Sequence, residues 1–179
     1  VLLGKSDPLE IMETIQRERV THLYLPPTVI YMMLAHEKVR TFDYSSLQAF
    51  FYGASPMSAA KLKTAIEIFG PVMMQAYGQA ECPMYVTILT PEDHEVLGDP
   101  EREKRLLSAG RPTPFCRVAI MDDEGKLLPA GERGEIVTRG NLVMKGYFKN
   151  EKATREASAH GWHHTGDIGY FDADGFLYI

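Results

Sequence analysis

The first half of the chain alternates between apolar stripes at helical spacing and short apolar runs typical of buried strands. One helix is predicted to begin with Asp7 as its cap and Pro8 in its first turn. Two further helices are predicted at residues 28–34 and 58–69, and buried strands at residues 21–25, 47–52 and 71–76. Because strands and helices alternate, the pattern predicts βαβ units around a mainly parallel sheet.

The second half of the chain shows short β-rich runs separated by turns that contain Asp, Pro and Gly. Strands are predicted at residues 116–121, 134–139, 169–171 and 176–179, and one short helix at residues 151–156. This spacing is typical of an antiparallel sheet or a small barrel. The predicted fold is an α/β layer with a mainly parallel sheet, followed by a β-rich, barrel-like subdomain. We expect residues 1–90 to form part of the α/β subdomain and residues 110–179 to form the β-rich subdomain. Residues 91–109 are expected to be the segment that connects them.

Composition and charge narrow the class of protein. With 179 residues, of which 45% are hydrophobic and 24% charged, the chain is expected to fold around an ordinary packed core. Its net charge of −5 gives no general basic footprint for nucleic acid. Cys82 and Cys116 lie far apart without a Cys-x-x-Cys pattern, so we interpret them as reduced thiols and expect a cytoplasmic protein. No apolar run approaches the ~18 residues of a membrane-spanning helix, so no integral membrane segment is expected.

The most informative stretch is residues 75–81, Gln75-Ala76-Tyr77-Gly78-Gln79-Ala80-Glu81. A predicted strand ends here, and Gly78 suits both a sharp turn and a close approach of backbone to a ligand. Tyr77 offers a flat face for a planar heterocycle, and Glu81 a hard oxygen ligand for magnesium beside a phosphate. The turn Gly53-Ala54-Ser55-Pro56 follows another predicted strand, and ligands of parallel sheets collect beyond such strand ends. Taken alone, a core tyrosine and ordinary loop chemistry explain these residues better.

Four stretches in a fixed order make the chemistry specific. They are residues 53–56, residues 75–81, Gly134-Glu135-Ile136 leading to Gly140 and Gly146-Tyr147, and finally His164-Thr165-Gly166-Asp167. This series closely resembles the adenylate-forming family that contains acyl-CoA synthetases, luciferases and the adenylation domains of peptide synthetases. The resemblance covers nearly the whole chain and implies the second half of that family's large amino-terminal domain.

The resemblance implies a reaction in two steps, using ATP, Mg²⁺ and coenzyme A. A small carboxylic acid attacks the α-phosphorus of ATP to give an acyl-adenylate and pyrophosphate, and a thiol such as coenzyme A then takes the acyl group. Such a reaction depends on charge neutralisation and alignment more than on a side-chain nucleophile. By the resemblance, Tyr77 packs on adenine, Asp167 accepts two hydrogen bonds from the ribose diol, and Glu81 is the catalytic, metal-binding residue. The binding residues that it implies are Gly53, Ala54, Ser55, Gln75, Ala76, Tyr77, Gly78, Gln79, Ala80 and Asp167.

Several of these residues have a second interpretation. Asp167 either binds ribose or simply fixes the turn that contains it. Gln75 either lines the acyl pocket or ends a strand. Three neighbouring histidines, His160, His163 and His164, suggest a metal site. Because two of them are adjacent and no third ligand type is evident, a solvated or strand-borne pair is favoured.

Two positions depart from the family pattern. Ala80 stands where many relatives carry a threonine whose hydroxyl can contact the α-phosphate, and Ala54 stands where they often have a second glycine. The family's glycine-rich phosphate loop and its carboxy-terminal domain lie outside these residues. The chain also begins in Val1-Leu2-Leu3 and ends in residues 176–179, both apolar and strand-like. We therefore expect a piece of a longer enzyme, with negligible synthetase activity in isolation.

The acid itself is not fixed by these motifs. A fatty or other hydrophobic acid is the leading hypothesis, because four methionines near the proposed site suit an alkyl pocket: Met57, Met73, Met74 and Met84. An amino-acid-activating domain would need a carboxylate for the substrate's ammonium group, and no clear candidate is evident near Gly53 or Tyr77. The change at Ala80 motivates a third hypothesis, a non-catalytic AMP-binding relative. The oligomeric state stays open.

Overall fold

The computed structural model describes residues 3–96 and 98–179, which form two compact units. The first unit comprises Val1–Gln75 and Thr90–Leu107, and the second comprises Ala76–Leu89 and Ser108–Ile179. The strand-like start expected at Val1-Leu2 lies outside the described residues. The two compact units are interleaved along the chain, so they do not test the subdomain bounds predicted from the sequence. Those bounds stay a prediction.

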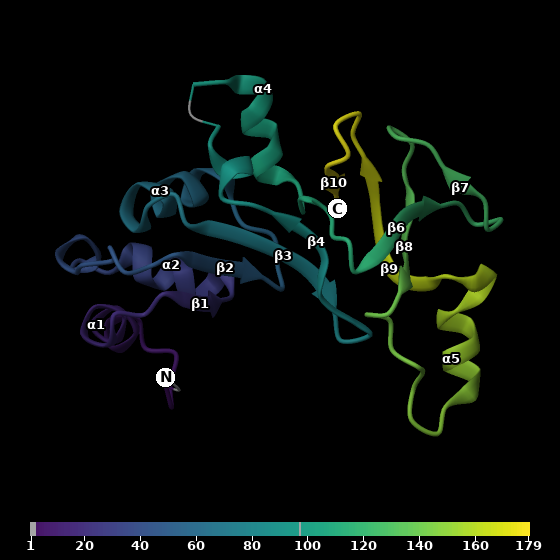
Figure 1. The fold of residues 1–179 in the computed structure, drawn as a ribbon, viewed down its shortest axis with the longest axis horizontal. Helices are drawn as coiled ribbons and strands as arrows, with labels where there is room; N and C mark the ends of the chain where they lie inside the picture. The colour runs from purple at the N-terminus through teal and green to yellow at the C-terminus, as the bar shows by residue number, and fades with distance from the viewer. Residues whose placement is uncertain (1–2, 97) are drawn as a thin grey trace. The chain divides into compact units, whose positions relative to one another are not determined.

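The elements follow one another as Figure 1 labels them. The helices are α1 (Pro8–Glu18), α2 (Pro27–Ala35), α3 (Ala59–Phe69), α4 (Pro100–Glu103) and α5 (Glu151–Ala157). The strands are β1 (His22–Leu25), β2 (Ala49–Gly53), β3 (Met73–Gln79), β4 (Cys82–Leu89), β5 (Arg111–Pro112), β6 (Cys116–Met121), β7 (Leu127–Leu128), β8 (Gly134–Gly140), β9 (His163–Phe171) and β10 (Leu177–Tyr178). None of the described helices has both the length and the apolar character needed to cross a bilayer.

Local sequence signals explain where the helices of the first unit begin and end. Asp7 caps α1, because its Oδ1 accepts a hydrogen bond from the Glu10 N–H at 2.9 Å, and Pro8 occupies the first turn. Gly70 ends α3 with φ 92°, a backbone conformation that glycine adopts at little cost. The three helices predicted in this part of the chain are thus confirmed, and Figure 1 shows α1 and α2 close to β1 and β2.

The core of the first unit forms where the apolar stripes of these helices meet the buried strand β2. Phe50 is fully buried, and its ring centroid lies 5.2 Å from that of Phe69 on α3. Met57 and Met73 belong to this same core, with 6% and 0% exposure. These two methionines are therefore core packing residues, so only two of the four methionines from which an alkyl pocket was inferred remain as candidates for it.

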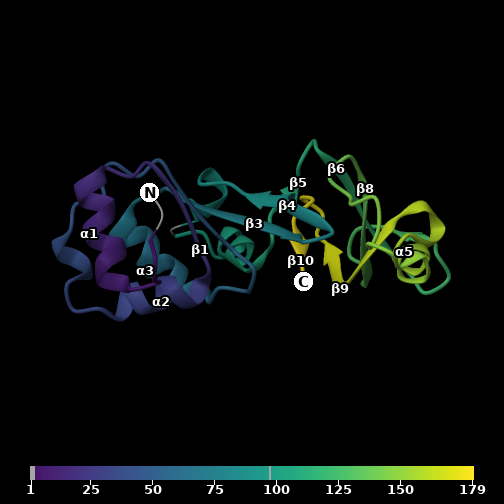
Figure 2. The same cartoon turned by 90° about the horizontal axis from the view of Figure 1, so that it is seen from below.

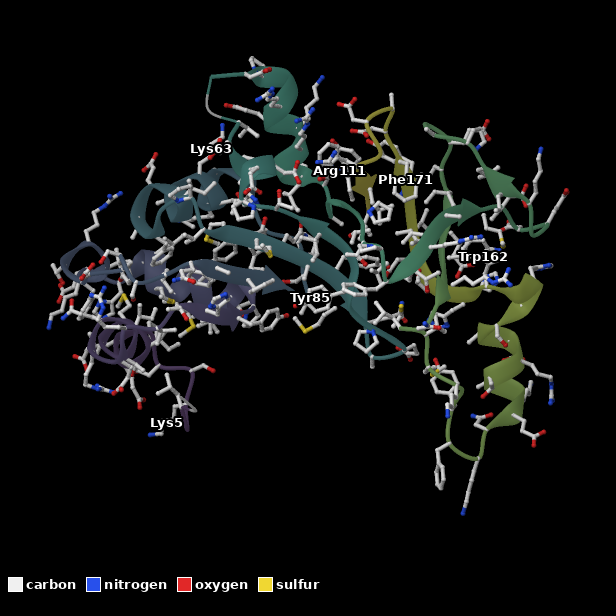
Figure 3. The ribbon with its side chains drawn as sticks, in the orientation of Figure 1. Lys5, Lys63, Tyr85, Arg111, Trp162 and Phe171 are labelled. Atoms are coloured by element: carbon white, nitrogen blue, oxygen red, sulfur yellow. The ribbon has the colours of Figure 1, made fainter. Side chains whose placement is uncertain are left out.

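Lys63 on α3, labelled in Figure 3, forms an ion pair of 2.7 Å with Glu103.

The first sheet is mixed rather than mainly parallel. Its strand order is β1-β2-β3-β4-β5, in which β1 and β2 are parallel and β4 and β5 antiparallel. The parallel part was predicted correctly, whereas β4 was missed. The run Cys82–Leu89 has exposed residues at 83–85 and no regular alternation, so its pattern is not that of a strand.

The second unit contains an antiparallel sheet with strand order β10-β9-β8-β6-β7. The predicted β-rich character of residues 110–179 is confirmed. Among the described residues this sheet is open, with β10 and β7 at its edges, rather than a closed barrel. The predicted strand at residues 169–171 is the end of β9, which begins six residues earlier at His163. The short α5 contacts β9 and lies beside it in Figures 1 and 2.

Both cysteines are free and buried in the second unit. Cys82 is fully buried, and Cys116 on β6 packs in the same apolar cluster. Burial raises the pKa of the Cys116 thiol to about 11, so it stays protonated at neutral pH and is a poor nucleophile.

A buried histidine in the first unit predicts acid sensitivity. His94 Nδ1 lies 2.6 Å from the Thr90 carbonyl, so it carries the proton, and Nε2 accepts from the Tyr52 hydroxyl at 2.9 Å. Burial lowers the pKa of His94. Below about pH 6.5 the unfolded chain therefore binds a proton that the folded chain rejects, and stability falls as pH decreases, by up to about 1.4 kcal/mol per pH unit. Urea unfolding from pH 7.5 to 5 should show this loss.

The control for this prediction replaces the histidine. His94→Gln should flatten the decline below pH 6.5, whereas His22→Gln, at an exposed site on β1, should leave it unchanged. His163 contributes with the same sign, since burial lowers its pKa as well. An H94Q chain with the wild-type slope would contradict the assignment.

Candidate functional site

The stretch singled out from the sequence lies at a hairpin. Strand β3 continues through Tyr77 and Gly78 to Gln79, and a two-residue turn of Ala80 and Glu81 leads into β4. The prediction that Gly78 makes the turn is therefore wrong. A Cβ on Gly78 would lie 2.5 Å from the Met84 nitrogen and 2.8 Å from the Cys82 carbonyl oxygen. Glycine is required here because the backbone of β4 approaches too closely for a side chain.

A bulge in β9 carries the second part of the site. Ile168 pairs with Glu135 and His164 pairs with Val137, so the three residues Thr165-Gly166-Asp167 face the single residue Ile136 of β8. Gly166 has φ +77°, which other residues adopt only with strain. Bulges next to active sites re-aim a side chain away from the regular pleat. The Thr-Gly-Asp motif thus places Asp167 on a local irregularity of the pairing between β9 and β8.

Side chains hold this bulge in shape. The Thr165 hydroxyl donates to the Ile136 carbonyl at 2.7 Å and accepts from the Asp167 N–H at 3.1 Å. Glu135 Oε1 accepts from the Gly166 N–H at 2.9 Å, while its Oε2 lies 2.7 Å from His164 Nδ1. Thr165 and Glu135 therefore work as a scaffold for Asp167. His164 is one of the paired histidines, and it is strand-borne, as was favoured over a metal site.

Tyr77 and Asp167, which are 90 positions apart in the sequence, meet in the second unit. The Tyr77 hydroxyl donates to Asp167 Oδ2 at 2.6 Å. Burial, followed by this hydrogen bond, raises the pKa of Tyr77, so the hydroxyl remains a donor throughout the physiological range. The Gln79 amide donates to the Thr165 carbonyl at 3.1 Å and ties the hairpin to the bulge a second time. A carboxylate has about four acceptor positions, so Asp167 can accept further donors.

Glu81 lies in the hairpin turn and has a fixed partner. The Tyr147 hydroxyl donates to Glu81 Oε1 at 2.8 Å, and the Met144 N–H donates to the Glu81 carbonyl at 2.7 Å. The hydrogen bond from Tyr147 lowers the pKa of Glu81, which is therefore ionised at neutral pH. Tyr147 is itself held through its N–H, which donates to Thr154 Oγ1 on α5 at 2.9 Å.

The chemistry of Glu81 fits a magnesium ion that is held jointly with phosphate. Mg²⁺ commonly takes one or two protein carboxylates and completes its shell with water and phosphate oxygens. Within residues 3–96 and 98–179, no group of three or more His, Cys, Asp or Glu side chains is arranged to hold a metal by protein ligands alone. Glu81 supplies the single ionised carboxylate that a shared site requires.

The remaining predicted residues lie in the first unit. Gly53 is the buried last residue of β2, and Ala54 and Ser55 form an exposed bend after it. The predicted turn after this strand is confirmed. The side-chain oxygen of Gln75 is buried and has no hydrogen-bond partner among the described residues, so it can accept a hydrogen bond from a ligand. The binding roles of these four residues stay predictions, as do those of Ala76, Gln79 and Ala80.

Ala54 carries backbone strain that predicts a stabilising substitution. Its φ of 68° lies in the left-handed region, which costs a residue with a Cβ about 1–2 kcal/mol. Ala54→Gly should relieve this cost and lose about 0.4–1 kcal/mol through the more flexible unfolded chain. We therefore expect a neutral effect or a gain of up to about 1.6 kcal/mol in urea unfolding. Ala60→Gly on α3 is the control and should destabilise by about 1 kcal/mol.

Sequence reasoning missed two residues that organise the site. Tyr147 was quoted only as part of a motif, and Glu135 was given no role. Neither carries a local signal, since a tyrosine after glycine and a glutamate at the start of a strand are common. The one signal that pointed to both is their place in the series of motifs that also contains Glu81 and Thr165-Gly166-Asp167.

Comparison with known proteins identifies the class and then the family. Solved structures with this fold, which combines an α/β unit and a unit built on an antiparallel sheet, are adenylate-forming enzymes. The chain belongs to the AMP-binding enzyme family, whose sequence pattern matches residues 1–148.

Three relatives show the range of proteins with this fold. The medium/long-chain-fatty-acid–CoA ligase FadD8 of Mycobacterium tuberculosis is 43% identical over the whole chain, which covers 30% of that protein. The amide bond synthetase McbA of Marinactinospora thermotolerans has a TM-score of 0.90 and 38% identity, over 99% of this chain and 35% of that one. The O-succinylbenzoate coenzyme A synthetase of Bacillus subtilis, solved with AMP, has a TM-score of 0.81 and 31% identity, over 96% and 33%. The chain thus spans about a third of the length of these relatives.

Proposed function

We propose that these residues form the nucleotide-binding part of a longer acid–CoA ligase, which activates a hydrophobic carboxylic acid with ATP. The observation that carries the proposal is the 2.6 Å contact between Tyr77 and Asp167, which sets an aromatic ring beside a carboxylate that can still accept hydrogen bonds. Adenine stacking and ribose binding need such a pair. The fatty-acid ligase with 43% identity supports the hydrophobic acid.

Each residue has one task in the proposed reaction. The ring of Tyr77 packs on adenine, and Asp167 accepts hydrogen bonds from the two ribose hydroxyls. Magnesium, when bound with ATP, neutralises charge on the phosphates, and Glu81 is the protein ligand that holds it. The acid's carboxylate oxygen then forms a bond to the α-phosphorus as the bond to pyrophosphate breaks. The thiol sulfur of coenzyme A next bonds to the acyl carbon and loses its proton to solvent, and AMP leaves as the bond between the acyl carbon and its phosphate oxygen breaks.

The proposal assigns the other predicted residues by the same logic. Gly53, Ala54 and Ser55 approach the adenine or the acyl group, and Gln75 offers its free oxygen to one of them. Ala76, Gly78, Gln79 and Ala80 bind through backbone around the hairpin. The proposal also keeps residues 1–90, 91–109 and 110–179 as parts of the larger enzyme's amino-terminal domain, and the cytoplasm as its compartment.

Ala80 favours one competing function, a relative that binds AMP without turnover. This residue lies exposed in the hairpin turn and has no hydroxyl to donate to a phosphate. An amino-acid-activating enzyme is the other alternative. The 38% identity with an amide bond synthetase supports a further alternative, in which an amine is the acceptor in place of the thiol.

ATP–pyrophosphate exchange with the longer protein tests the proposal. Fatty acids of graded length, aryl acids and amino acids are offered in turn, and coenzyme A or a simple amine follows as the acceptor. Exchange that depends on a hydrophobic acid, with thioester as the product, is the expected result. AMP binding without exchange for any acid would favour the non-catalytic relative, and exchange with amino acids alone would favour the amino-acid-activating enzyme.

The same assay tests the isolated residues 1–179. We expect them to give no exchange above background, because the residues that complete the family's site lie in the other two thirds of the relatives' length. Acid-dependent exchange by this chain alone would overturn that part of the proposal.

A further inference from the structure

The conformation of Glu81 is fixed by a chain of hydrogen bonds that starts on α5. Thr154 Oγ1 donates to the Asn150 carbonyl at 2.9 Å and accepts from the Tyr147 N–H at 2.9 Å. The Tyr147 hydroxyl in turn donates to Glu81 Oε1 at 2.8 Å. These residues all belong to the second unit.

Two further features keep Tyr147 in this position. Gly146 has φ +150°, and a Cβ there would lie 2.7 Å from Thr154 Cγ2, so only glycine lets the loop pass this close to α5. On the other side of the loop, the Met144 N–H donates to the Glu81 carbonyl at 2.7 Å. The loop therefore holds the turn by its backbone and holds the carboxylate by one hydroxyl.

The hydrogen bond between Tyr147 and Glu81 is exposed, which indicates that the Tyr147 hydroxyl does more than stabilise the fold. Tyr147 is 38% exposed and lies outside the hydrophobic clusters of the second unit. An exposed hydrogen bond between side chains adds little to stability, because water competes for both partners. It does restrict a flexible glutamate to one rotamer, and a ligand that is held in advance loses less entropy when it binds.

We propose that Tyr147 is a positioning residue, which orients the Glu81 carboxylate for a magnesium ion bound with ATP. The proposal rests on the proposed function, because it takes Glu81 as the metal ligand. One oxygen of Glu81 accepts from Tyr147, and the other oxygen would be the one that binds the metal. Outer hydrogen bonds of this kind typically change metal affinity 10- to 100-fold in metalloproteins.

The test measures metal binding without turnover, in the longer protein. Mn²⁺, a paramagnetic substitute for Mg²⁺, is titrated in the presence of a non-hydrolysable ATP analogue, and the free ion is followed by electron paramagnetic resonance. Tyr147→Phe should weaken Mn²⁺ binding about 10-fold and leave binding of the metal-free nucleotide unchanged. Thr154→Val removes the acceptor for the Tyr147 N–H but keeps the Tyr147 hydroxyl. It should weaken metal binding by a smaller factor.

Tyr170→Phe is the matched control. Tyr170 on β9 has the same 38% exposure, and its hydroxyl makes no hydrogen bond to the residues that the structure describes. It should bind Mn²⁺ as the wild type does. Thermal melting of all variants checks that a change in metal binding is not a change in folding.

The outcomes separate this inference from the proposed function. Wild-type affinity in Tyr147→Phe, together with loss of the metal in Glu81→Gln, would overturn the positioning role and leave the proposed function intact. Undiminished metal binding in Glu81→Gln would overturn both. A metal affinity that falls in Tyr147→Phe but not in Tyr170→Phe is the result that supports the inference.

Discussion

Asp167→Asn should weaken AMP binding by the longer protein roughly 100-fold, or about 3 kcal/mol. The reason is that the carboxylate would accept two charge-assisted hydrogen bonds from the ribose diol, and an amide offers one neutral acceptor in their place. The amide oxygen can still accept from the Tyr77 hydroxyl, which lies 2.6 Å from Asp167 Oδ2. The fold is therefore kept, and calorimetric titration with AMP measures the loss directly.

A second ligand shows whether the loss involves the ribose. For 2′,3′-dideoxy-AMP, the wild type and Asp167→Asn should bind with similar, weak affinity, because the hydroxyls that the carboxylate is proposed to bind are gone. Tyr77→Phe is the companion variant: it keeps the ring and loses one hydrogen bond, so AMP binding should change no more than about fivefold. Equal losses for AMP and its dideoxy form would show that Asp167 acts through the fold alone, which is its structural interpretation.

Gly110→Ala should destabilise the second unit by at least about 3 kcal/mol and in practice prevent its folding. A Cβ at this position would lie 2.1 Å from both the carbonyl carbon and the oxygen of Ile88, and these backbone atoms cannot move aside. Gly110 also has φ +84°, and its carbonyl accepts from the Leu177 N–H at 2.8 Å. The residue is thus fixed between β4 and β10, where backbone meets backbone.

The matched control separates the clash from the backbone strain. Gly131 has nearly the same φ, +88°, but a Cβ there would meet nothing within 4 Å. Gly131→Ala should therefore cost only about 1–2 kcal/mol, the strain of the left-handed conformation. Urea unfolding of both variants checks the prediction, and equal costs would show that the close approach at Gly110 is relaxed in solution.

Helices in this chain were predicted well because their signals are local. The cap at Asp7, the proline after it and the glycine that ends α3 each act within one turn of backbone. The strand β4 was missed because its pairing with β3 and β5 lies outside its own sequence. Its exposed residues break the alternation by which a strand is recognised.

In the candidate site, too, features with local signals were predicted and features that depend on distant segments were not. The sequence by itself determined the residue types, their order and the family, because the motifs that carry the resemblance can be recognised along the chain without any structure. Only the tertiary structure decided that Gly78 lies inside a strand, that Thr165-Gly166-Asp167 is a bulge, and that Tyr147 contacts Glu81. The last two of those features depend on segments that approach each other across 29 to 66 positions of sequence, and the first depends on how closely β4 packs on β3; no local pattern encodes such proximity.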